Sequence, residues 1–481
     1  MLINDQDVVI VGAGPAGSSL AIELSKLGAK VLLVDRESFP RDKPCGDYVS
    51  PKGIARLKEL GVSEAINTIG SQAITSSRLY LNKDLLVSGD LPTLDGLPNY
   101  GLALPRKELD NILFARAAAL GVNVQENFSV TGYEKNNDGV SVTGKLNGKN
   151  VAVSSKLLIG ADGANSIIAK NAGLDCKDPR YVLASLRAYV HGLSLPHTLM
   201  FFDERFFPGY GWIFPVRDGL CNIGVGMVKE SIVRGGVNLL AFYEQFKLLV
   251  HRLAESRGER AEIEPHQGFP IKSYGGARRN YFDGGLLIGE AASFVDPING
   301  EGIPLALDSA KLAAAEIKRC FESGDFSEES LASYEKSWRG YFDPDLGISD
   351  LVVSLLRNKE MQPLWLSLFK TMSFTARSDK KYADITGGIL GGVIPARQAL
   401  TPEMFLRALV HPPAFWREVY DVDSLPDLST LLVRGKQFFA WQSNFSRLIL
   451  GKDSWTREWL KEIAIKQASV LYNQAAVNHH G

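Results

Sequence analysis

The chain has 481 residues, and its 53 basic and 54 acidic side chains leave a formal net charge of −1. This balance excludes the basic surface that nucleic acid requires, so no nucleic-acid partner is expected. The hydrophobic content of 45% is typical of a folded chain with two or three domains, and no apolar run is long enough to predict a membrane-spanning helix.

The first predicted elements are a strand over 8–14, a glycine turn and a helix, followed by a second strand that ends at Asp35. In the G-x-G-x-x-G turn, Gly12 allows the sharp bend and Gly14 lets backbone N–H groups approach a pyrophosphate. Gly17 lets the helix pack close to the strand. Asp35 lies about twenty residues further on, where a ribose hydroxyl needs an acceptor. The pattern predicts a dinucleotide-binding unit, with no cleaved signal peptide before it.

Two later segments repeat the change from strand to glycine turn. Residues 129–163 contain two turn signals between alternating apolar runs, which predict a three-stranded antiparallel meander that ends in the strand 157–163. The strand 284–289 leads through a glycine-rich turn into a long helix that begins near Ile303. We therefore expect three strand-to-turn junctions, far apart in sequence, to meet at one sheet edge.

These patterns predict an α/β fold with a discontinuous Rossmann-like cofactor domain, an antiparallel-sheet substrate domain and a C-terminal helical extension. The glycine-rich segment 385–396 is predicted to be a loop or hinge. The predicted boundaries are 1–75, 101–175 and 271–325 for the cofactor domain, 76–100 and 176–270 for the substrate domain, and 326–481 for the helical region.

The cysteines and histidines predict no metal site. The four cysteines show no C-x-x-C spacing, which argues against a zinc site or a disulfide framework and fits a cytoplasmic protein. The histidines show no paired ligand spacing. The cysteines are Cys45, Cys176, Cys221 and Cys320.

Four motifs together resemble the flavoprotein superfamily of aromatic hydroxylases, over about the first 330 residues. They are GAGPAG at the N-terminus, RKELD at Arg106, GADG at 160–163 and the turn GEAASFVDPINGEGI. Two more motifs, FPRDKPCGD at 39–47 and GYGWIFP at 209–215, are similar to the geranylgeranyl reductase family of that superfamily. The resemblance implies an FAD cofactor held across the three junctions.

The resemblance also assigns residues to FAD. It gives the glycine turn to the pyrophosphate, Asp35 to the adenosine ribose and Arg106 to a cofactor contact. Two positions depart from the pattern, because Glu290 replaces an aspartate and Ala169 replaces an arginine. The full predicted cofactor set is Gly12, Gly14, Gly17, Asp35, Arg106, Asp162, Gly163, Glu290, Asp296, Gly300, Gly302 and Ile303.

On the substrate side, Tyr210, Trp212 and Phe214 alternate along one predicted strand and therefore share a face. From spacing alone they fill a sheet core or line an apolar slot, and the resemblance favours a slot over the flavin. Cys45 lies in the turn after the second strand. The resemblance places it near the flavin, where a thiol can supply a proton, whereas the alternative is a buried apolar cysteine. Cys45, Tyr210 and Trp212 are the predicted catalytic residues.

The leading hypothesis is an FAD-dependent reductase of an isoprenoid or similar hydrophobic alkene, with hydride from reduced flavin and electrons from NAD(P)H or a ferredoxin. The alternative is a monooxygenase or halogenase that acts on an aromatic or olefin through a flavin C4a-peroxide. The halogenase motif W-x-W-x-I-P is altered here at Tyr210 and Phe214, which lowers that option. A third hypothesis is a flavin-free binding protein.

The helical extension contains aromatic residues among basic ones. They predict packing on the core, on a dimer partner or over the substrate tunnel, or peripheral contact with a membrane. The expected partner is a hydrophobic small molecule, and the oligomeric state is left open. The residues are Phe438, Phe439, Trp441 and Phe445, with Arg434, Lys436 and Arg447.

Overall fold

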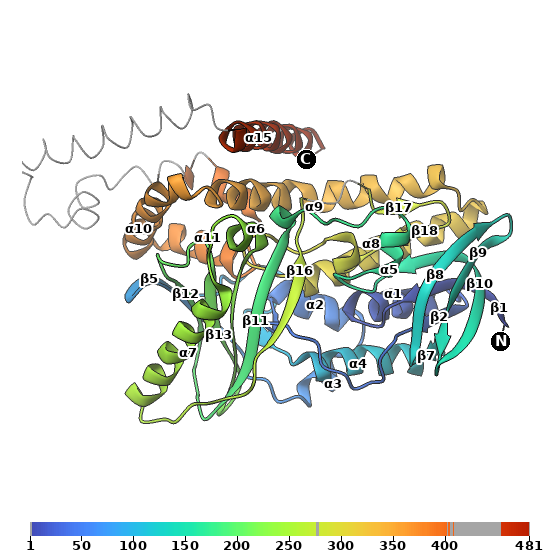
Figure 1. The fold of residues 1–481 in the computed structure, drawn as a ribbon, viewed down its shortest axis with the longest axis horizontal. Coiled ribbons are helices and arrows are strands. Elements are labelled where there is room, and N and C mark those ends of the chain that lie inside the picture. The colour runs from blue at the N-terminus through green and yellow to red at the C-terminus, as the bar shows by residue number, and fades with distance from the viewer. Residues whose placement is uncertain (1, 276–278, 402, 405–406, 408–453, 481) are drawn as a thin grey trace, which may run out of the picture.

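The computed structural model describes residues 2–275, 279–401, 403–404, 407 and 454–480. Two eight-stranded sheets lie side by side, and a long helix spans both of them (Figure 1). The predicted α/β fold with a helical C-terminal region is confirmed. The predicted aromatic and basic cluster between 434 and 447 lies outside the described residues.

The first sheet has a parallel centre and runs in the order β17-β18-β10-β1-β2-β7, with β9 paired to β10 and β8 to β9. Val8, Val9 and Ile10 are fully buried, as expected for a strand covered on both faces. Strands β8, β9 and β10 form the predicted antiparallel meander. The bounds are β1 Leu2–Val11, β2 Val31–Val34, β7 Asn123–Gln125, β8 Phe128–Asn136, β9 Gly139–Leu146, β10 Lys149–Gly160, β17 Tyr281–Phe282 and β18 Gly285–Leu287.

Helices cover this sheet. Helix α1 packs against α8 and α4, and it ends just before Gly28, whose φ of +76° gives the left-handed turn that commonly terminates a helix. Helix α8 begins at Ile303, as predicted. The bounds are α1 Pro15–Lys26, α2 Pro51–Glu59, α3 Ser63–Asn67, α4 Arg106–Ala119, α5 Ile167–Asn171 and α8 Ile303–Ser323.

The second sheet is built mostly from antiparallel pairs, in the order β15-β11-β14-β13-β12-β4-β5 with β16 also paired to β11. Helix α7 packs on β14 and β11 and lies on the outer side of the sheet (Figure 1). The bounds are β4 Ser76–Leu81, β5 Asp84–Asp90, β11 Val182–His191, β12 Thr198–Phe202, β13 Tyr210–Arg217, β14 Leu220–Val228, β15 Glu262–Ile263, β16 Gln267–Lys272, α6 Lys229–Val233 and α7 Leu239–Ser256.

A short third sheet pairs β3 (Tyr48–Val49) with β6 (Leu102–Ala103). It follows directly on the predicted motif 39–47. The backbone N–H of Leu104 also donates to the carbonyl oxygen of Asp47 at 2.8 Å. The pairing therefore fixes the end of that loop against the start of α4.

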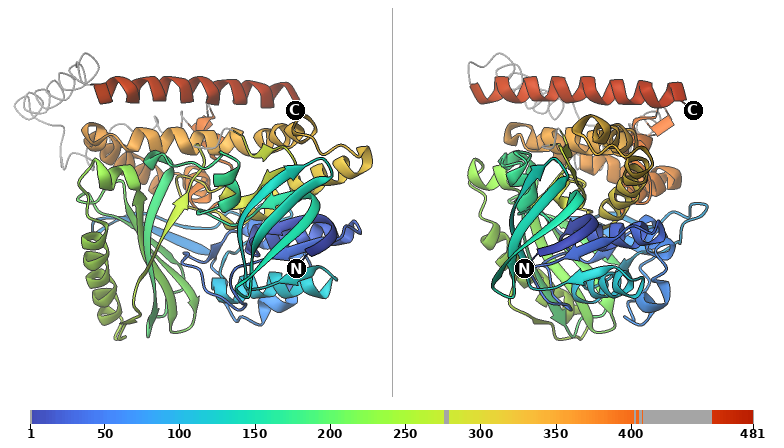
Figure 2. Two further views of the ribbon diagram at one scale, coloured as in Figure 1. Left: turned by 45° about the vertical axis from the view of Figure 1, so that its right-hand side comes forward. Right: turned by 90° about the vertical axis from the view of Figure 1, so that its right-hand side faces the viewer.

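The C-terminal region is helical, as expected. Helix α9 (Glu328–Leu356) begins after Ser327, whose hydroxyl accepts a hydrogen bond from the backbone N–H of Ser330. Helix α15 (Ser454–His480) runs along α9 on its outer side (Figure 2). In the sequence, α10 (Gln362–Ser378) and α11 (Lys380–Leu390) come between α9 and α15. No described helix combines the length and apolar character needed to cross a bilayer.

The prediction of a loop over 385–396 is wrong for its first half, because α11 continues to Leu390. A Cβ atom on Gly388 would lie 2.7 Å from Ile394 and 2.8 Å from Pro92. The glycine therefore serves close packing inside a helix, and the connector begins only at Gly391.

Candidate active site

A cavity of about 1210 Å³ is lined by residues of both sheets and of the C-terminal helices. One end lies against the three strand-to-turn junctions of the first sheet. The other end is walled by apolar side chains of β12, α9, α10 and α11. The site therefore has a polar end and an apolar end in one continuous space.

The glycine turn forms part of the polar end. A Cβ atom on Gly12 would lie 2.5 Å from the carbonyl oxygen of Ala161, and one on Gly17 would lie 1.9 Å from the carbonyl oxygen of Gly12. Gly14 is different, since its Cβ would meet only the side-chain ends of Arg41 and Arg106, at 3.6 and 3.8 Å. Gly12 and Gly17 thus serve the backbone packing, while Gly14 keeps the cavity wall open.

Asp35 reinforces this turn from the end of β2. Its Oδ2 accepts a hydrogen bond from the backbone N–H of Ala13 at 2.8 Å, and its Oδ1 accepts one from Glu37 at 3.0 Å. Arg41 Nη2 lies 3.6 Å from the same carboxylate. Asp35 lines the cavity, so it both holds the turn and presents a carboxylate there.

Arg106 begins α4, as predicted, and is buried. Its guanidinium donates to both carboxylate oxygens of Asp110 at 2.6 and 2.7 Å, and Arg41 donates to Asp110 at 2.8 Å. Burial opposes the charge, but Asp110 outweighs it and raises the pKa of Arg106. Two permanent cations therefore border the Gly14 turn.

The second junction contributes Asp162 and Gly163. Asp162 Oδ2 accepts hydrogen bonds from the backbone at the start of α5, including one of 2.7 Å from Ile167. The buried Oδ1 has no partner among the described residues. Burial raises the pKa of this carboxyl group. Ala169 is buried in the core, so this position offers no side chain in place of the arginine that the resemblance led us to expect.

The third junction contributes Glu290 and the turn that precedes α8. Glu290 Oε2 accepts from Lys43 Nζ at 2.7 Å, and Gly300, Gly302 and Ile303 line the cavity. Asp296 lies outside the lining. Its two oxygens accept from the backbone N–H of Ile298 at 2.8 Å and from the hydroxyl of Ser349 at 3.1 Å, so its side chain supports the turn.

The predicted aromatic face is present on β13, where Tyr210, Trp212 and Phe214 all line the cavity. The ring centroids of Trp212 lie 6.1 Å from those of Tyr210 and 6.2 Å from those of Phe214. Tyr210 donates to the carbonyl oxygen of Asn299 at 2.8 Å, which ties β13 to the turn before α8. The position of these three side chains therefore favours the apolar slot as their role, rather than the filling of a sheet core.

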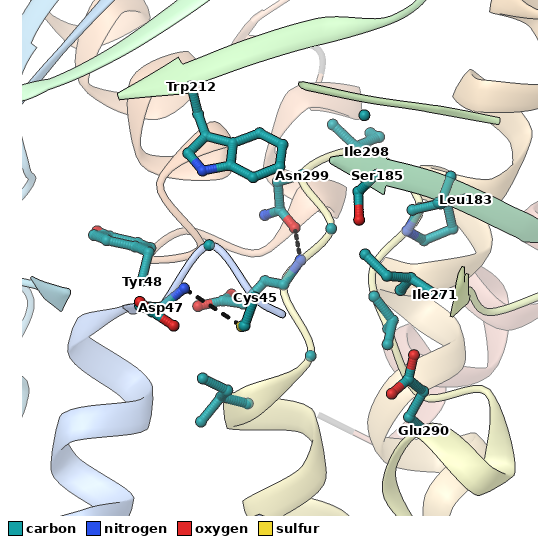
Figure 3. Close-up of a pocket in the computed structure, with 18 of the residues that line it drawn as sticks. Cys45, Asp47, Tyr48, Leu183, Ser185, Trp212, Ile271, Glu290, Ile298 and Asn299 are labelled. Atoms are coloured by element: carbon teal, nitrogen blue, oxygen red, sulfur yellow. Dashed lines mark hydrogen bonds between the residues drawn. The ribbon is translucent and has the colours of Figure 1, made fainter. Parts of the chain in front are cut away.

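Cys45 lies on the loop after β2 and lines the same cavity as Trp212 (Figure 3). Its Sγ accepts a hydrogen bond from the backbone N–H of Asp47 at 3.4 Å. Burial raises the pKa of the thiol, and the charge of Arg106 opposes this. The thiol is therefore protonated at neutral pH and can donate a proton into the cavity.

The polar end fits an elongated dianion bound to a planar ring. The N-terminus of α1 and the cations of Arg41 and Arg106 favour a pyrophosphate. Asp162 Oδ1, which has no partner among the described residues, can accept from a hydroxyl, and the Gly300 turn leaves backbone exposed beside the aromatic face. These are the groups that FAD requires.

The comparison with known families agrees, because the model of the FAD binding domain family matches residues 5–340. The chain belongs to this family. It is an FAD-binding oxidoreductase, and FAD is its cofactor. The individual residue contacts to FAD stay predictions.

Relatives within the family include reductases and a halogenase. The chain is 31% identical over 345 residues to a digeranylgeranylglycerophospholipid reductase of Methanococcus vannielii. The match covers 70% of this chain and 83% of that protein. The chain is 27% identical over 360 residues to a 1H-pyrrole-2-carbonyl-[peptidyl-carrier protein] chlorinase of Pseudomonas fluorescens, covering 69% and 80%.

A solved structure supports the fold of this FAD-binding chain. The geranylgeranyl bacteriochlorophyll reductase-like protein of Thermoplasma acidophilum superposes with a TM-score of 0.67 and 22% identity. The match covers 88% of this chain and 100% of the other. At this level of identity, the match bears on the fold alone.

Three residues of the FAD-binding chain were not predicted from the sequence. Asn222 accepts from Trp212 Nε1 at 2.9 Å and donates to the carbonyl oxygen of Cys45 at 2.8 Å. Tyr189 donates to Asp47, and Lys43 pairs with Glu290. The one available signal was Asn222 itself, a polar residue in the apolar strand β14, where asparagine is disfavoured.

Proposed function

We propose that this FAD-dependent oxidoreductase reduces a carbon–carbon double bond in an isoprenoid or a similar long hydrophobic chain. The observation that carries the proposal is the continuity of the cavity. It extends from Cys45 and Trp212 into a space walled by apolar side chains of four elements. These side chains include Met200 and Phe202 of β12, Val352 and Leu356 of α9, Phe369 and Met372 of α10, and Ile389 and Leu390 of α11.

An elongated apolar substrate fits this shape better than a compact polar one. The aromatic rings of Phe202 and Phe369 stack with centroids 5.5 Å apart, which gives the distal wall a firm apolar surface. Burying a chain of methylene and methyl groups there contributes about 0.8 kcal/mol for each group. The reacting double bond would lie at the near end, between the flavin position and the aromatic face.

The chain's own residues supply orientation and a proton. FAD supplies hydride chemistry when its ring is reduced. Trp212 is held by Asn222 and Tyr210 by Asn299, so the aromatic face is fixed before substrate arrives. Cys45 holds a proton on Sγ at neutral pH and is the proposed acid for the second carbon of the double bond.

The reductant belongs to the proposal too. We infer that NAD(P)H or a ferredoxin delivers electrons transiently, because only one G-x-G-x-x-G turn is present in the sequence. Stopped-flow reduction of the holoprotein by NADH, NADPH or reduced ferredoxin distinguishes these donors.

The alternative function, halogenation or oxygenation, is supported by the chlorinase among the relatives. Against the halogenase reading, Lys43 is the only lysine among the described residues that line the cavity. Its ammonium group is held by Glu290 in an ion pair, whereas halogenases of this superfamily need a reactive lysine in the tunnel. The geometry therefore favours the reductase.

The decisive experiment is a rapid-reaction study of the reduced holoprotein. Anaerobic mixing with a geranylgeranyl compound is expected to reoxidise the flavin, and mixing with air-saturated buffer is expected to reoxidise it with no long-lived oxygen adduct. A long-lived adduct in air, with no reaction of the alkene, would overturn the reductase proposal in favour of the monooxygenase or halogenase.

A further inference from the structure

Asp47 is a fully buried acid in the wall of the cavity, and only one of its two oxygens is satisfied. Its backbone has a φ of +65°. Its Oδ2 accepts hydrogen bonds from the hydroxyl of Tyr189 at 2.6 Å and from Asn222 Nδ2 at 2.8 Å. Its Oδ1 is buried and has no partner in the part of the chain that the structure describes. An unsatisfied buried carboxylate oxygen favours the protonated acid, with the proton on Oδ1.

The same acid is linked to Cys45. The backbone N–H of Asp47 donates to Cys45 Sγ at 3.4 Å, and the side chains lie next to each other in the cavity wall (Figure 3). Asn222 Nδ2 donates both to Asp47 Oδ2 and to the carbonyl oxygen of Cys45, while its Oδ1 accepts from Trp212. Acid, thiol and indole therefore form one hydrogen-bonded unit.

The charged and titratable groups around Asp47 come from three elements. Tyr189 and Arg187 face it from β11, and the Arg187 guanidinium lies 4.5 Å from the centroid of the Tyr189 ring. Arg106 faces it from α4, and Cys45 lies on its own loop. Burial raises the pKa of Asp47, and the contacts with Tyr189, Arg187, Asn222 and Arg106 oppose this, leaving a value of about 7.

Arg187 does not neutralise Asp47 directly. Its guanidinium donates to both oxygens of Asp42, at 2.9 and 2.7 Å. Likewise, the two side-chain hydrogen bonds of Arg106 go to Asp110. Both cations have carboxylate partners of their own, and their attraction lowers the pKa of Asp47 without overcoming the effect of burial.

We propose that Asp47 is a positioning residue that sets the acidity of the Cys45 thiol. When Asp47 is neutral, the thiol can release its proton, because the thiolate has the Asp47 N–H and the Arg106 guanidinium beside it. When Asp47 is ionised, its charge opposes the thiolate and holds the proton on sulfur. The inference rests on the role proposed above for Cys45, and it makes proton delivery weaker as the pH rises through about 7.

The test measures the thiol directly and does not depend on alkene reduction. Cys45 of the FAD-loaded protein is alkylated with iodoacetamide over a pH series, and modification of that peptide is followed by mass spectrometry. Alkylation reports the thiolate fraction. In Asp47→Asn the negative charge cannot form, so Cys45 is expected to react about tenfold faster than in the wild type at pH values above 7.

Glu301→Gln is the matched control. Glu301 also lines the cavity, and burial raises its pKa to about 7, but it is not among the groups that shift the thiol. This variant is expected to keep the wild-type alkylation profile. Equal profiles for Asp47→Asn and the wild type, or the same acceleration in Glu301→Gln, would overturn the proposal.

A second variant keeps the carboxyl group. Tyr189→Phe removes one donor to Asp47 Oδ2, so Asp47 stays neutral to higher pH and Cys45 is expected to react several-fold faster near pH 8. An unchanged rate contradicts the inference even if Asp47→Asn does not fold. A protein that reduces no alkene but shows these alkylation shifts would contradict the proposed function and leave the Asp47 inference standing.

Discussion

Lys43 Nζ lies 2.7 Å from Glu290 Oε2, and this ion pair joins the loop after β2 to the turn after β18. A Cβ on Gly163 would lie 3.6 Å from Lys43 Nζ and 3.7 Å from Glu290 Oε2, so the second and third junctions meet the loop after β2 at this pair. Glu290 is one methylene longer than the aspartate of the superfamily, and its carboxylate contacts Lys43 across the cavity wall.

Lys43→Met is expected to destabilise the protein by about 1 to 2 kcal/mol, because it leaves a half-buried carboxylate without its cation. Glu290→Gln should cost a similar amount. Thermal or urea unfolding of both variants and of the double variant measures the coupling. If the two losses simply add in the double variant, the ion pair contributes nothing.

Gly14→Ala is expected to fold normally but to bind FAD at least about tenfold more weakly, because the new methyl group occupies the cavity wall where the pyrophosphate must approach. Gly17→Ala is expected not to fold, since its Cβ would overlap the carbonyl oxygen of Gly12. Flavin absorbance of the purified proteins and FAD titration of Gly14→Ala check both. Full FAD affinity in Gly14→Ala would place the pyrophosphate elsewhere.

The apolar end of the cavity is expected to limit the length of the substrate that the enzyme accepts. Gly387 lines it and has open space around its Cβ position, so the side chain introduced by Gly387→Leu is expected to extend into the far end. The expected result is a fall of about tenfold in kcat/KM for a geranylgeranyl compound, with little change for a geranyl compound. Gly340→Leu on α9 is the control, because that glycine is exposed, equally unobstructed and outside the cavity lining.

Helix α15 is expected to detach in acid. Burial raises the pKa of Glu462, but Arg357, Lys466 and Arg180 outweigh burial and lower it to about 2. A lowered pKa stabilises the docked helix above the ordinary glutamate pKa, and that stability is lost as pH falls from there toward about 2. Hydrogen exchange of α15 should therefore accelerate in this window in the wild type. Glu462→Gln should show fast exchange already at pH 7, and equal protection in both proteins would refute the role of the charge cluster.

The sequence alone predicted the features that depend on residues close together in the chain. The glycine turn, Asp35 and the start of α8 follow local rules of backbone geometry, and the alternating aromatics of β13 follow strand periodicity. The hydrogen-bonded unit around Cys45 could not be predicted in this way. Asn222 meets Asp47 across 175 positions and Tyr189 meets it across 142, because the loop after β2 packs on a sheet formed much later in the chain.

Two details of the structure have the same origin. The glycines near 387 suggested a loop, but tertiary packing on Pro92 and Ile394 favours a helix there. The predicted cofactor contact of Asp296 stays a prediction, and the structure adds that its two oxygens accept from its own turn and from Ser349 of α9. Neither long-range contact leaves a local pattern in the sequence.

The most direct test of the central claim is the mass of the product formed when reduced holoprotein meets a polyprenyl substrate without oxygen, in heavy water. The reductase account predicts one double bond saturated per reduced flavin, with solvent deuterium in the saturated bond, and less product from Cys45→Ala. A substrate that returns unchanged without oxygen, and gains an oxygen or halogen atom only when air and halide are present, would contradict it.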